Sequence, residues 1–353
     1  MTSLKSEILI DANILRKNIK TIKNKLQKKS KFMAVIKSDA YGHNLSSIVK
    51  DIDDLVDGYG VVRIEEALEI RKQSNKKVLL MQGVYSKEEY ILSKNQKLDL
   101  VIHNNNQFNL IKDEGNHEMF WYKVNTGMNR LGFEIPDFIK IYEKYLTEKQ
   151  FTIMSHLASS NDKDNPANES QFKSFNDLSN KLKNNILKSI ANTGCIMNFP
   201  ESSMDWVRCG IGIYGGYLKD DQLETAMTLR SPIINIRSIK KGDKVGYDGR
   251  AVAKNDMKIA SVYLGYADGL PVTIKDGTSV MVNNQIAKVF GKVSMDLTTI
   301  DVTNIANCRI NDWCEFFSPK LPISNISKSN DLITYYFMTN IKSRVKKVYK
   351  SID

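Results

Sequence analysis

The sequence predicts a (β/α)8 TIM barrel over residues 1–226, followed by a mainly β domain over residues 227–353. In the first part, short apolar runs alternate regularly with segments of helical spacing, as in parallel sheets whose strands are joined by helices. After about Met227 this alternation stops, and short strands separated by turn residues follow. A length of 353 residues is also consistent with two domains.

Eight apolar runs are the expected barrel strands, the number that a (β/α)8 barrel requires. They cover residues 32–37, 58–63, 77–84, 98–103, 119–126, 151–157, 189–193 and 207–214. Segments of helical spacing lie between them, for example residues 64–73 and 170–184. A doubly wound parallel sheet stays open as an alternative.

The second domain is expected to contain seven short strands and one helix. The strands are predicted at residues 231–239, 243–246, 258–266, 278–282, 286–293, 298–302 and 313–317, and the helix at 330–339. Asn283-Asn284 predicts a two-residue hairpin turn between two of these strands.

Composition limits the possible functions. The net charge of +11 raises a nucleic-acid hypothesis, but only ten of the 51 basic residues are arginine, which base recognition favours. The lysines between Lys17 and Lys31 are interpreted as the solvated face of an amphipathic helix. No run approaches the roughly 20 apolar residues of a membrane span, and no secretory signal is evident. Four scattered cysteines predict neither disulfides nor a metal site, which favours a cytoplasmic protein.

Polar residues follow several of the predicted barrel strands, where barrel enzymes carry their chemistry. Lys37 ends an otherwise apolar strand, so burial there would lower its pKa and make it nucleophilic, although a lysine extended into water is the alternative. Thr193-Gly194 and Gly210-Ile211-Gly212 offer a phosphate cradle at strands seven and eight. A lysine and a phosphate cradle at one barrel mouth indicate pyridoxal phosphate (PLP).

Six motifs together resemble the alanine racemases, the barrel-type PLP enzymes, and they occur in the order of that family. They are Ala34-Val35-Ile36-Lys37-Ser38-Asp39-Ala40-Tyr41-Gly42-His43, Lys123-Val124-Asn125-Thr126-Gly127-Met128-Asn129-Arg130-Leu131-Gly132, Arg208-Cys209-Gly210-Ile211, Lys244-Val245-Gly246-Tyr247, Gly265-Tyr266-Ala267-Asp268-Gly269 and Ser294-Met295-Asp296. The resemblance extends from residue 34 to residue 296.

The resemblance implies that Lys37 holds PLP covalently and that Lys37 and Tyr247 are two acid/base groups on opposite faces of the substrate. Tyr247 would act in the active site of the partner subunit of a homodimer. The implied cofactor-binding residues are Tyr41, His156, Asn192, Thr193, Arg208, Gly210 and Ile211, and the implied substrate-binding residues are Arg130, Tyr266 and Met295. Lys123 matches a lysine often carried as a carbamate in the family, with a plain ion pair inside the barrel as the alternative.

Three positions depart from the family pattern. Asn125 stands where many members have Asp, Lys292 replaces a common Arg at the substrate entryway, and Ser343 is assigned to a position often held by a phosphate-contacting Tyr. The last two put the entryway charge and the details of phosphate anchoring in doubt.

The implied function is interconversion of L-alanine and D-alanine in the cytoplasm, supplying D-alanine for peptidoglycan. An amino-acid racemase of broader specificity and a non-catalytic PLP-binding protein remain alternatives, and a basic nucleic-acid-binding protein is a third. The β domain argues against the non-catalytic carrier, because such proteins lack one. Barrel decarboxylases share the lysine motif, but Tyr247 stands where they should offer a cysteine.

Overall fold

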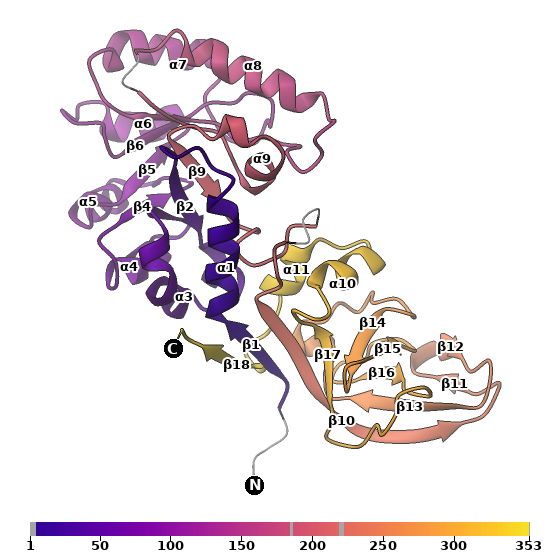
Figure 1. Cartoon of the computed structure of the whole chain (residues 1–353). Coiled ribbons are helices and arrows are strands. Elements are labelled where there is room, and N and C mark those ends of the chain that lie inside the picture. The colour runs from indigo at the N-terminus through magenta and orange to yellow at the C-terminus, as the bar shows by residue number, and fades with distance from the viewer. Residues whose placement is uncertain (1–4, 184–185, 219–221, 353) are drawn as a thin grey trace. The chain divides into compact units, whose positions relative to one another are not determined.

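The computed structural model describes residues 5–183, 186–218 and 222–352, and the chain forms two compact units (Figure 1). The barrel unit comprises Arg16–Ala40 and Asn44–Ile213. The C-terminal unit comprises Met1–Leu15, Tyr41–His43 and Tyr214–Asp353.

The barrel unit is built on one parallel eight-stranded sheet in the order β8-β7-β6-β5-β4-β3-β2-β9. Its strands are β2 (Lys31–Val35), β3 (Gly58–Val61), β4 (Lys77–Leu80), β5 (Asp99–Ile102), β6 (Phe120–Lys123), β7 (Thr152–Met154), β8 (Leu187–Ser189) and β9 (Trp206–Cys209). The ends of the sheet meet where the Arg208 N–H donates to the Ala191 carbonyl, at 2.9 Å. The predicted barrel is therefore confirmed. Every strand is shorter than predicted, and β8 precedes the predicted run 189–193, with which it shares only Ser189.

Large apolar side chains fill the interior of the barrel. Met33, Leu79, Val101, Trp121, Met154 and Trp206 form one buried cluster. They come from six different strands of the sheet, so each of these strands contributes to a single core. Burial on both faces explains why the barrel strands are continuous apolar runs in the sequence.

The helices of the barrel unit lie between consecutive strands (Figure 1). They are α1 (Ala12–Lys23), the short turn α2 (Lys37–Tyr41), α3 (Leu45–Ile52), α4 (Ile64–Arg71), α5 (Lys87–Asn95), α6 (Asn105–Ile111), α7 (Ile135–Ile141), α8 (Ala167–Ser179) and α9 (Thr193–Asn198), with single turns η1 (Asp53–Leu55), η2 (Tyr142–Leu146) and η3 (Pro200–Ser202). Asn104 and Asn192 cap α6 and α9 by accepting backbone N–H groups.

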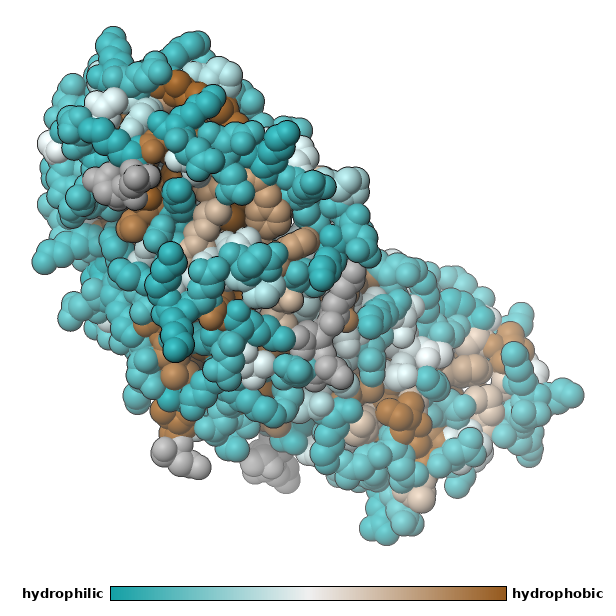
Figure 2. All heavy atoms as spheres, turned by 45° about the horizontal axis from the view of Figure 1, so that its top comes forward, coloured by the Kyte–Doolittle hydropathy of each residue, from teal (hydrophilic) through white to brown (hydrophobic). Residues whose placement is uncertain are grey.

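The lysine-rich segment near the N-terminus is partly as predicted. Ile19 and Ile22 are fully buried on α1, whereas Lys17 and Lys20 are exposed. The helix ends at Lys23, short of the predicted Lys31. Figure 2 shows hydrophilic side chains over most of the displayed face. No helix within the described ranges is long and apolar enough to cross a bilayer.

The C-terminal unit contains a mainly antiparallel sheet in the order β13-β16-β15-β14-β17-β10-β1-β18, with β13 also paired to β10. Its strands are β1 (Glu7–Asp11), β10 (Met227–Ile239), β13 (Met257–Val262), β14 (Ser279–Val282), β15 (Gln285–Val289), β16 (Thr298–Asp301), β17 (Trp313–Phe317) and β18 (Lys346–Lys350), and β11 (Lys244–Val245) pairs separately with β12 (Ala251–Val252). The remaining elements are η4 (Tyr247–Gly249), η5 (Tyr266–Asp268), α10 (Ile323–Ser329) and α11 (Thr334–Thr339).

Two predicted details of this unit have different outcomes. The Asn283-Asn284 turn is confirmed, because both residues have positive φ, 50° and 60°, between the paired residues Val282 and Gln285. The helix predicted at 330–339 is shorter, α11, and follows α10 across Asp331, whose φ is 54°.

The N-terminal strand β1 was not predicted. It pairs antiparallel with β10 and parallel with β18, so the first residues of the range predicted for the barrel domain belong to the other sheet. Ile8 and Ile10 are fully buried and their neighbours are half-buried, an alternation that fits a sheet with one covered face. Because α1 follows β1 directly, the segment resembles one more β-α step of the barrel.

Candidate active site

Lys37 lies just beyond β2, at the start of a left-handed turn. The predicted strand ends at Val35 instead of Lys37, because Ser38, Asp39, Ala40 and Tyr41 all have φ between 52° and 56°. Burial lowers the pKa of Lys37, and the nearby charge of Arg130 lowers it further, while Glu66 opposes both. A lysine in this position has a larger fraction of neutral, nucleophilic amine than one in water.

Arg208 is buried inside the barrel, and both of its terminal nitrogens donate hydrogen bonds. One terminal nitrogen donates to Ser189 Oγ, and the other donates to the Ser155 carbonyl at 2.6 Å. Burial lowers its pKa to about 10, so the guanidinium stays charged at neutral pH. Its Nε–H is buried and has no partner. Because a buried donor without an acceptor is costly, this atom fits a bound ligand that offers a hydrogen-bond acceptor.

His156 follows β7 and lies beside Arg208. Its Nδ1 is 3.5 Å from the Arg208 Nη2, and its Nε2 is 3.3 Å from the Asn192 Nδ2. Burial holds the pKa of His156 well below its ordinary value, and the charges of Arg208 and Lys123 reinforce this. The ring is therefore neutral, and both of its nitrogens lie beside side-chain N–H donors, those of Arg208 and Asn192.

Thr193 accepts hydrogen bonds from the backbone segment that follows β9. Its Oγ1 accepts the N–H of Gly210 at 3.2 Å and the N–H of Gly212 at 3.5 Å. Gly194 is favoured beside it, because a Cβ there would lie 2.9 Å from the backbone nitrogen of Asn161. The predicted cradle residues of strands seven and eight, Ile211 included, are thus brought together, and the Gly210 amide is oriented by Thr193.

Lys123 is buried among cations at the end of β6. Burial lowers its pKa to about 8, and the charges of Arg208, Arg130 and Lys37 contribute. No acidic group of the described residues acts on it, so the expected alternative of an ion pair is not found there. His103, at the end of the neighbouring β5, was not predicted; it is buried, and its Nε2 has no partner.

Arg130 is exposed on a loop that Asn125 organises. Asn125 Oδ1 accepts the N–H of Gly127 at 3.1 Å and of Asn129 at 3.0 Å. Its Nδ2 donates to Glu134 Oε1 at 2.9 Å. An Asp at this position could not donate to Glu134, which gives the departure from the family pattern a physical reason.

The predicted residues of the C-terminal unit lie on its surface. Tyr247 is 67% exposed, Met295 54% and Tyr266 40%. Tyr247, Tyr266 and Lys292 line one pocket of about 690 Å³ within this unit. Lys292 pairs with Asp248 at 3.0 Å, so the lysine at the predicted entryway is held beside Tyr247.

Arg344 forms ion pairs with two loops that carry predicted site residues. The arginine itself was not predicted from the sequence. It pairs with Asp268 at 2.9 Å and with Asp296 at 2.7 Å, the acids of the Tyr266 and Met295 motifs. The scarcity of arginine in this chain is the one signal that could have drawn attention to it.

Ser343 stands at a position where family members often have a phosphate-contacting tyrosine, and another tyrosine of this chain lies near Tyr41. Ser343 is exposed in a turn. Tyr335 of α11 lies 5.8 Å from Tyr41, ring centre to ring centre, and Tyr41 stacks on Tyr214 at 4.7 Å. A second phenol therefore lies beside Tyr41 although residue 343 is a serine, and no spacing in the sequence indicates it.

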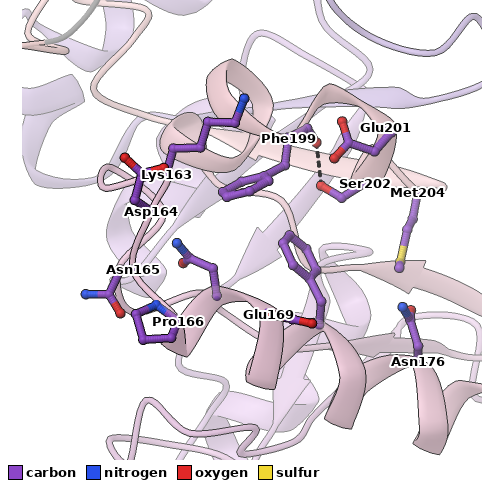
Figure 3. Close-up of a pocket in the computed structure, with 12 residues that line it drawn as sticks. Lys163, Asp164, Asn165, Pro166, Glu169, Asn176, Phe199, Glu201, Ser202 and Met204 are labelled. Carbon is purple, nitrogen blue, oxygen red and sulfur yellow. Dashed lines mark hydrogen bonds between the residues drawn. The ribbon is translucent and has the colours of Figure 1, made fainter.

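A separate pocket of about 620 Å³ lies along α8 and η3 (Figure 3). Phe172 and Phe199 meet edge to face there at 5.3 Å. It contains none of the predicted site residues. Within the described ranges, no group of three His, Cys, Asp or Glu side chains could hold a metal ion.

Two family models cover nearly the whole chain. The alanine racemase N-terminal domain matches residues 10–218, and the alanine racemase C-terminal domain matches residues 226–349. The chain belongs to the alanine racemase family. The resemblance inferred from the six motifs is thereby confirmed, and with it the class of enzyme, an amino-acid isomerase.

Relatives in this racemase family match from end to end. The alanine racemase of Alteromonas mediterranea is 34% identical, with 99% of both chains covered. That of Nitrosomonas eutropha is 32% identical over 96% of this chain and 97% of its own. The structure of alanine racemase from Acinetobacter baumannii superposes with a TM-score of 0.93 at 29% identity, covering 99% of this chain and all of that one. Alanine racemase from Bartonella henselae, described with covalently bound pyridoxal phosphate, gives 0.87 at 25% identity, with 99% and 100% covered.

Proposed function

We propose that this chain interconverts L-alanine and D-alanine with PLP held in the barrel unit. The observation that carries the proposal is the buried Nε–H of Arg208, which lacks an acceptor in a family whose Bartonella henselae member binds pyridoxal phosphate. When bound, PLP withdraws electrons from the substrate α-carbon, so that its proton becomes removable.

Lys37 is the residue that holds the cofactor. Its lowered pKa favours the neutral amine needed for a covalent link to the PLP aldehyde. Arg208 donates its Nε–H to the pyridine nitrogen and keeps its own proton, since its pKa of about 10 is well above neutral. We assign phosphate binding to Thr193, Gly210 and Ile211, where Thr193 holds the Gly210 backbone, and to Tyr41 on the family resemblance.

Two acid/base groups work on opposite faces of the substrate. Lys37 serves one face, and Tyr247 of the partner subunit serves the other. The high exposure of Tyr247, Tyr266 and Met295 supports a shared site, because these side chains are not enclosed within their own unit. The protein therefore acts as a homodimer with composite active sites.

The neutral His156 links Arg208 to the catalytic phenol. We assign His156 the position between Arg208 and the phenol of Tyr247 in the partner subunit, where the positive charge of Arg208 favours the phenolate. A phenol is a poor base at neutral pH, and stabilising its anion makes proton removal feasible. Arg130 binds the substrate carboxylate from its exposed loop.

Lys123 carries a carbamate in this proposal. A neutral amine attacks CO₂, a nitrogen–carbon bond forms, and the amine proton passes to water. The resulting anion balances Arg130 and Arg208, whose charges act on Lys123. Asn192 positions the phosphate end by capping α9, where its Oδ1 accepts the Cys195 N–H at 3.0 Å.

In the cell, the proposed role is cytoplasmic supply of D-alanine for peptidoglycan. The direct test is loss of circular dichroism from L-alanine incubated with the protein and PLP, with serine and lysine as competing substrates. Racemisation of alanine alone supports the proposal, and equal rates on all three amino acids support the broader-specificity alternative. Borohydride reduction and peptide mapping should place the pyridoxyl group on Lys37, and another lysine would contradict the site.

A further inference from the structure

Glu66 makes an unusual set of contacts at the start of α4. Its Oε2 accepts the N–H groups of Val62 and Arg63, both at 3.2 Å. A glutamate at this helical position commonly returns to the residue that caps the helix, so this oxygen alone makes an ordinary helix cap. The second oxygen does something else.

Glu66 Oε1 accepts two backbone N–H groups from the turn that follows Lys37. The Ser38 N–H lies at 2.6 Å and the Asp39 N–H at 3.4 Å. One carboxylate therefore ties the end of β3 to the segment immediately after Lys37.

That segment needs such a tie. Four successive residues with Cβ atoms, Ser38–Tyr41, have positive φ, a conformation that L residues disfavour. At its far end, Asp39 Oδ1 accepts the Leu45 N–H at 2.8 Å. At its near end, next to Lys37, Glu66 accepts the Ser38 N–H. Strained backbone persists when its surroundings over-determine it, and it is found at functional sites.

We propose that Glu66 is a positioning residue, which fixes the left-handed turn and so aims the Lys37 side chain at its reaction partner. This inference rests on the proposed role of Lys37 in holding the cofactor. Glu66 acts through Lys37 and touches neither substrate nor cofactor.

The negative charge of Glu66 also acts on the amine of Lys37. The charge of Arg130 disfavours the ammonium form of Lys37, whereas the carboxylate of Glu66 favours it. The charge of Lys37 in turn acts on Lys123 and His156. Losing the carboxylate therefore lowers the pKa of Lys37 further.

Glu89 provides a matched control. It occupies the equivalent position on α5, where its Oε2 accepts the Tyr85 N–H at 2.8 Å, and within the described part of the chain no hydrogen bond joins it to the Lys37 turn. Glu89→Gln thus removes a helix cap of the same kind, whereas Glu66→Gln removes a cap and the tie to Lys37. Glu66→Asp keeps the negative charge, but its shorter side chain places the carboxylate farther from the Ser38 and Asp39 N–H groups.

The experiment compares the full-length variants with the unmodified chain by two measurements that do not depend on catalysis. Hydrogen exchange of the peptide containing Ser38 and Asp39 should accelerate in Glu66→Gln and Glu66→Asp, but not in Glu89→Gln. The pH dependence of Lys37 labelling by an amine-reactive reagent should shift to lower pH in Glu66→Gln, and less in Glu66→Asp. In the holoenzyme, kcat should fall about tenfold or more with little change in KM, because misplacement of a reacting group is costly.

Unchanged exchange and unchanged labelling in Glu66→Gln would overturn the inference. Faster exchange with kcat equal to that of Glu89→Gln would also overturn it, since the turn would then be structural only. The proposed function fails separately, if borohydride mapping of the unmodified holoenzyme finds the pyridoxyl group on a lysine other than Lys37.

Discussion

At the scale of single residues, the barrel site is a cluster of cations held by neutral partners. Arg208 donates to a hydroxyl and to carbonyl oxygens, and Lys123 has no acidic neighbour acting on it. Burying charge in this way is unfavourable unless a ligand or a modification compensates. The site is thus built to receive negative charge.

Carbamate formation on Lys123 should depend on pH in a defined direction. Its pKa is lowered to about 8, so the neutral amine accumulates as pH rises through that value. With ¹³C-labelled CO₂ held at a fixed dissolved concentration, the carbamate NMR signal should grow by more than roughly tenfold from pH 7 to pH 9 until the lysine is fully converted, because the neutral amine fraction rises about tenfold and each carbamate formed also releases a proton. Lys123→Arg should show no signal. A signal that is absent at all pH values would contradict the carbamate and leave Lys123 a bare cation.

At the scale of elements, the sequence predicts the repeated strands of the barrel well, but it does not predict local irregularities such as the turn after Lys37. Continuous apolar runs predicted seven of the barrel strands well, because strands buried on both faces leave that pattern, whereas β8 shares only Ser189 with its predicted run. The left-handed turn after Lys37 was not visible, since none of Ser38–Tyr41 is glycine. The grouping of Lys37, Thr193 and Arg208 followed from strand ends, whereas Glu66 and Arg344 act through contacts between segments distant in sequence, which no spacing reveals.

The loop after β6 gives a prediction at this scale. Asn125→Asp replaces the donor to Glu134 with a second carboxylate, so the loop that carries Arg130 should be disturbed. The KM for alanine should rise roughly three- to tenfold, and the free energy of unfolding should fall by about 1 kcal/mol. Adding Glu134→Gln restores a donor–acceptor pair and should recover most of both effects in steady-state kinetics and urea unfolding. If the double variant is no better than the single one, the Asn125–Glu134 contact does not position the loop.

At the scale of the whole molecule, the proposed catalytic pair lies in two different compact units. Lys37 belongs to the barrel unit, and Tyr247 belongs to the C-terminal unit. Mixing inactive Lys37→Ala with inactive Tyr247→Phe should restore activity after subunit exchange, because each mixed dimer would contain one intact site. Random exchange at equal concentrations makes half of the dimers mixed, so recovery should reach roughly a quarter of the sites at most. No recovery despite exchange seen by native mass spectrometry would place Tyr247 in the active site of its own chain.

The central claim is that Lys37 and Tyr247 are bases for opposite faces of the substrate. The most direct measurement is deuterium incorporation at the α-carbon of each alanine enantiomer by Tyr247→Phe in D₂O, followed by NMR. Racemisation should fall by about 10² to 10⁴, the usual contribution of one positioned acid/base group. The variant should still exchange the α-hydrogen of D-alanine through Lys37, and exchange that of L-alanine far more slowly. Equal loss of exchange from both enantiomers, with the cofactor still bound, would show that Tyr247 positions the substrate and is not a base for one face.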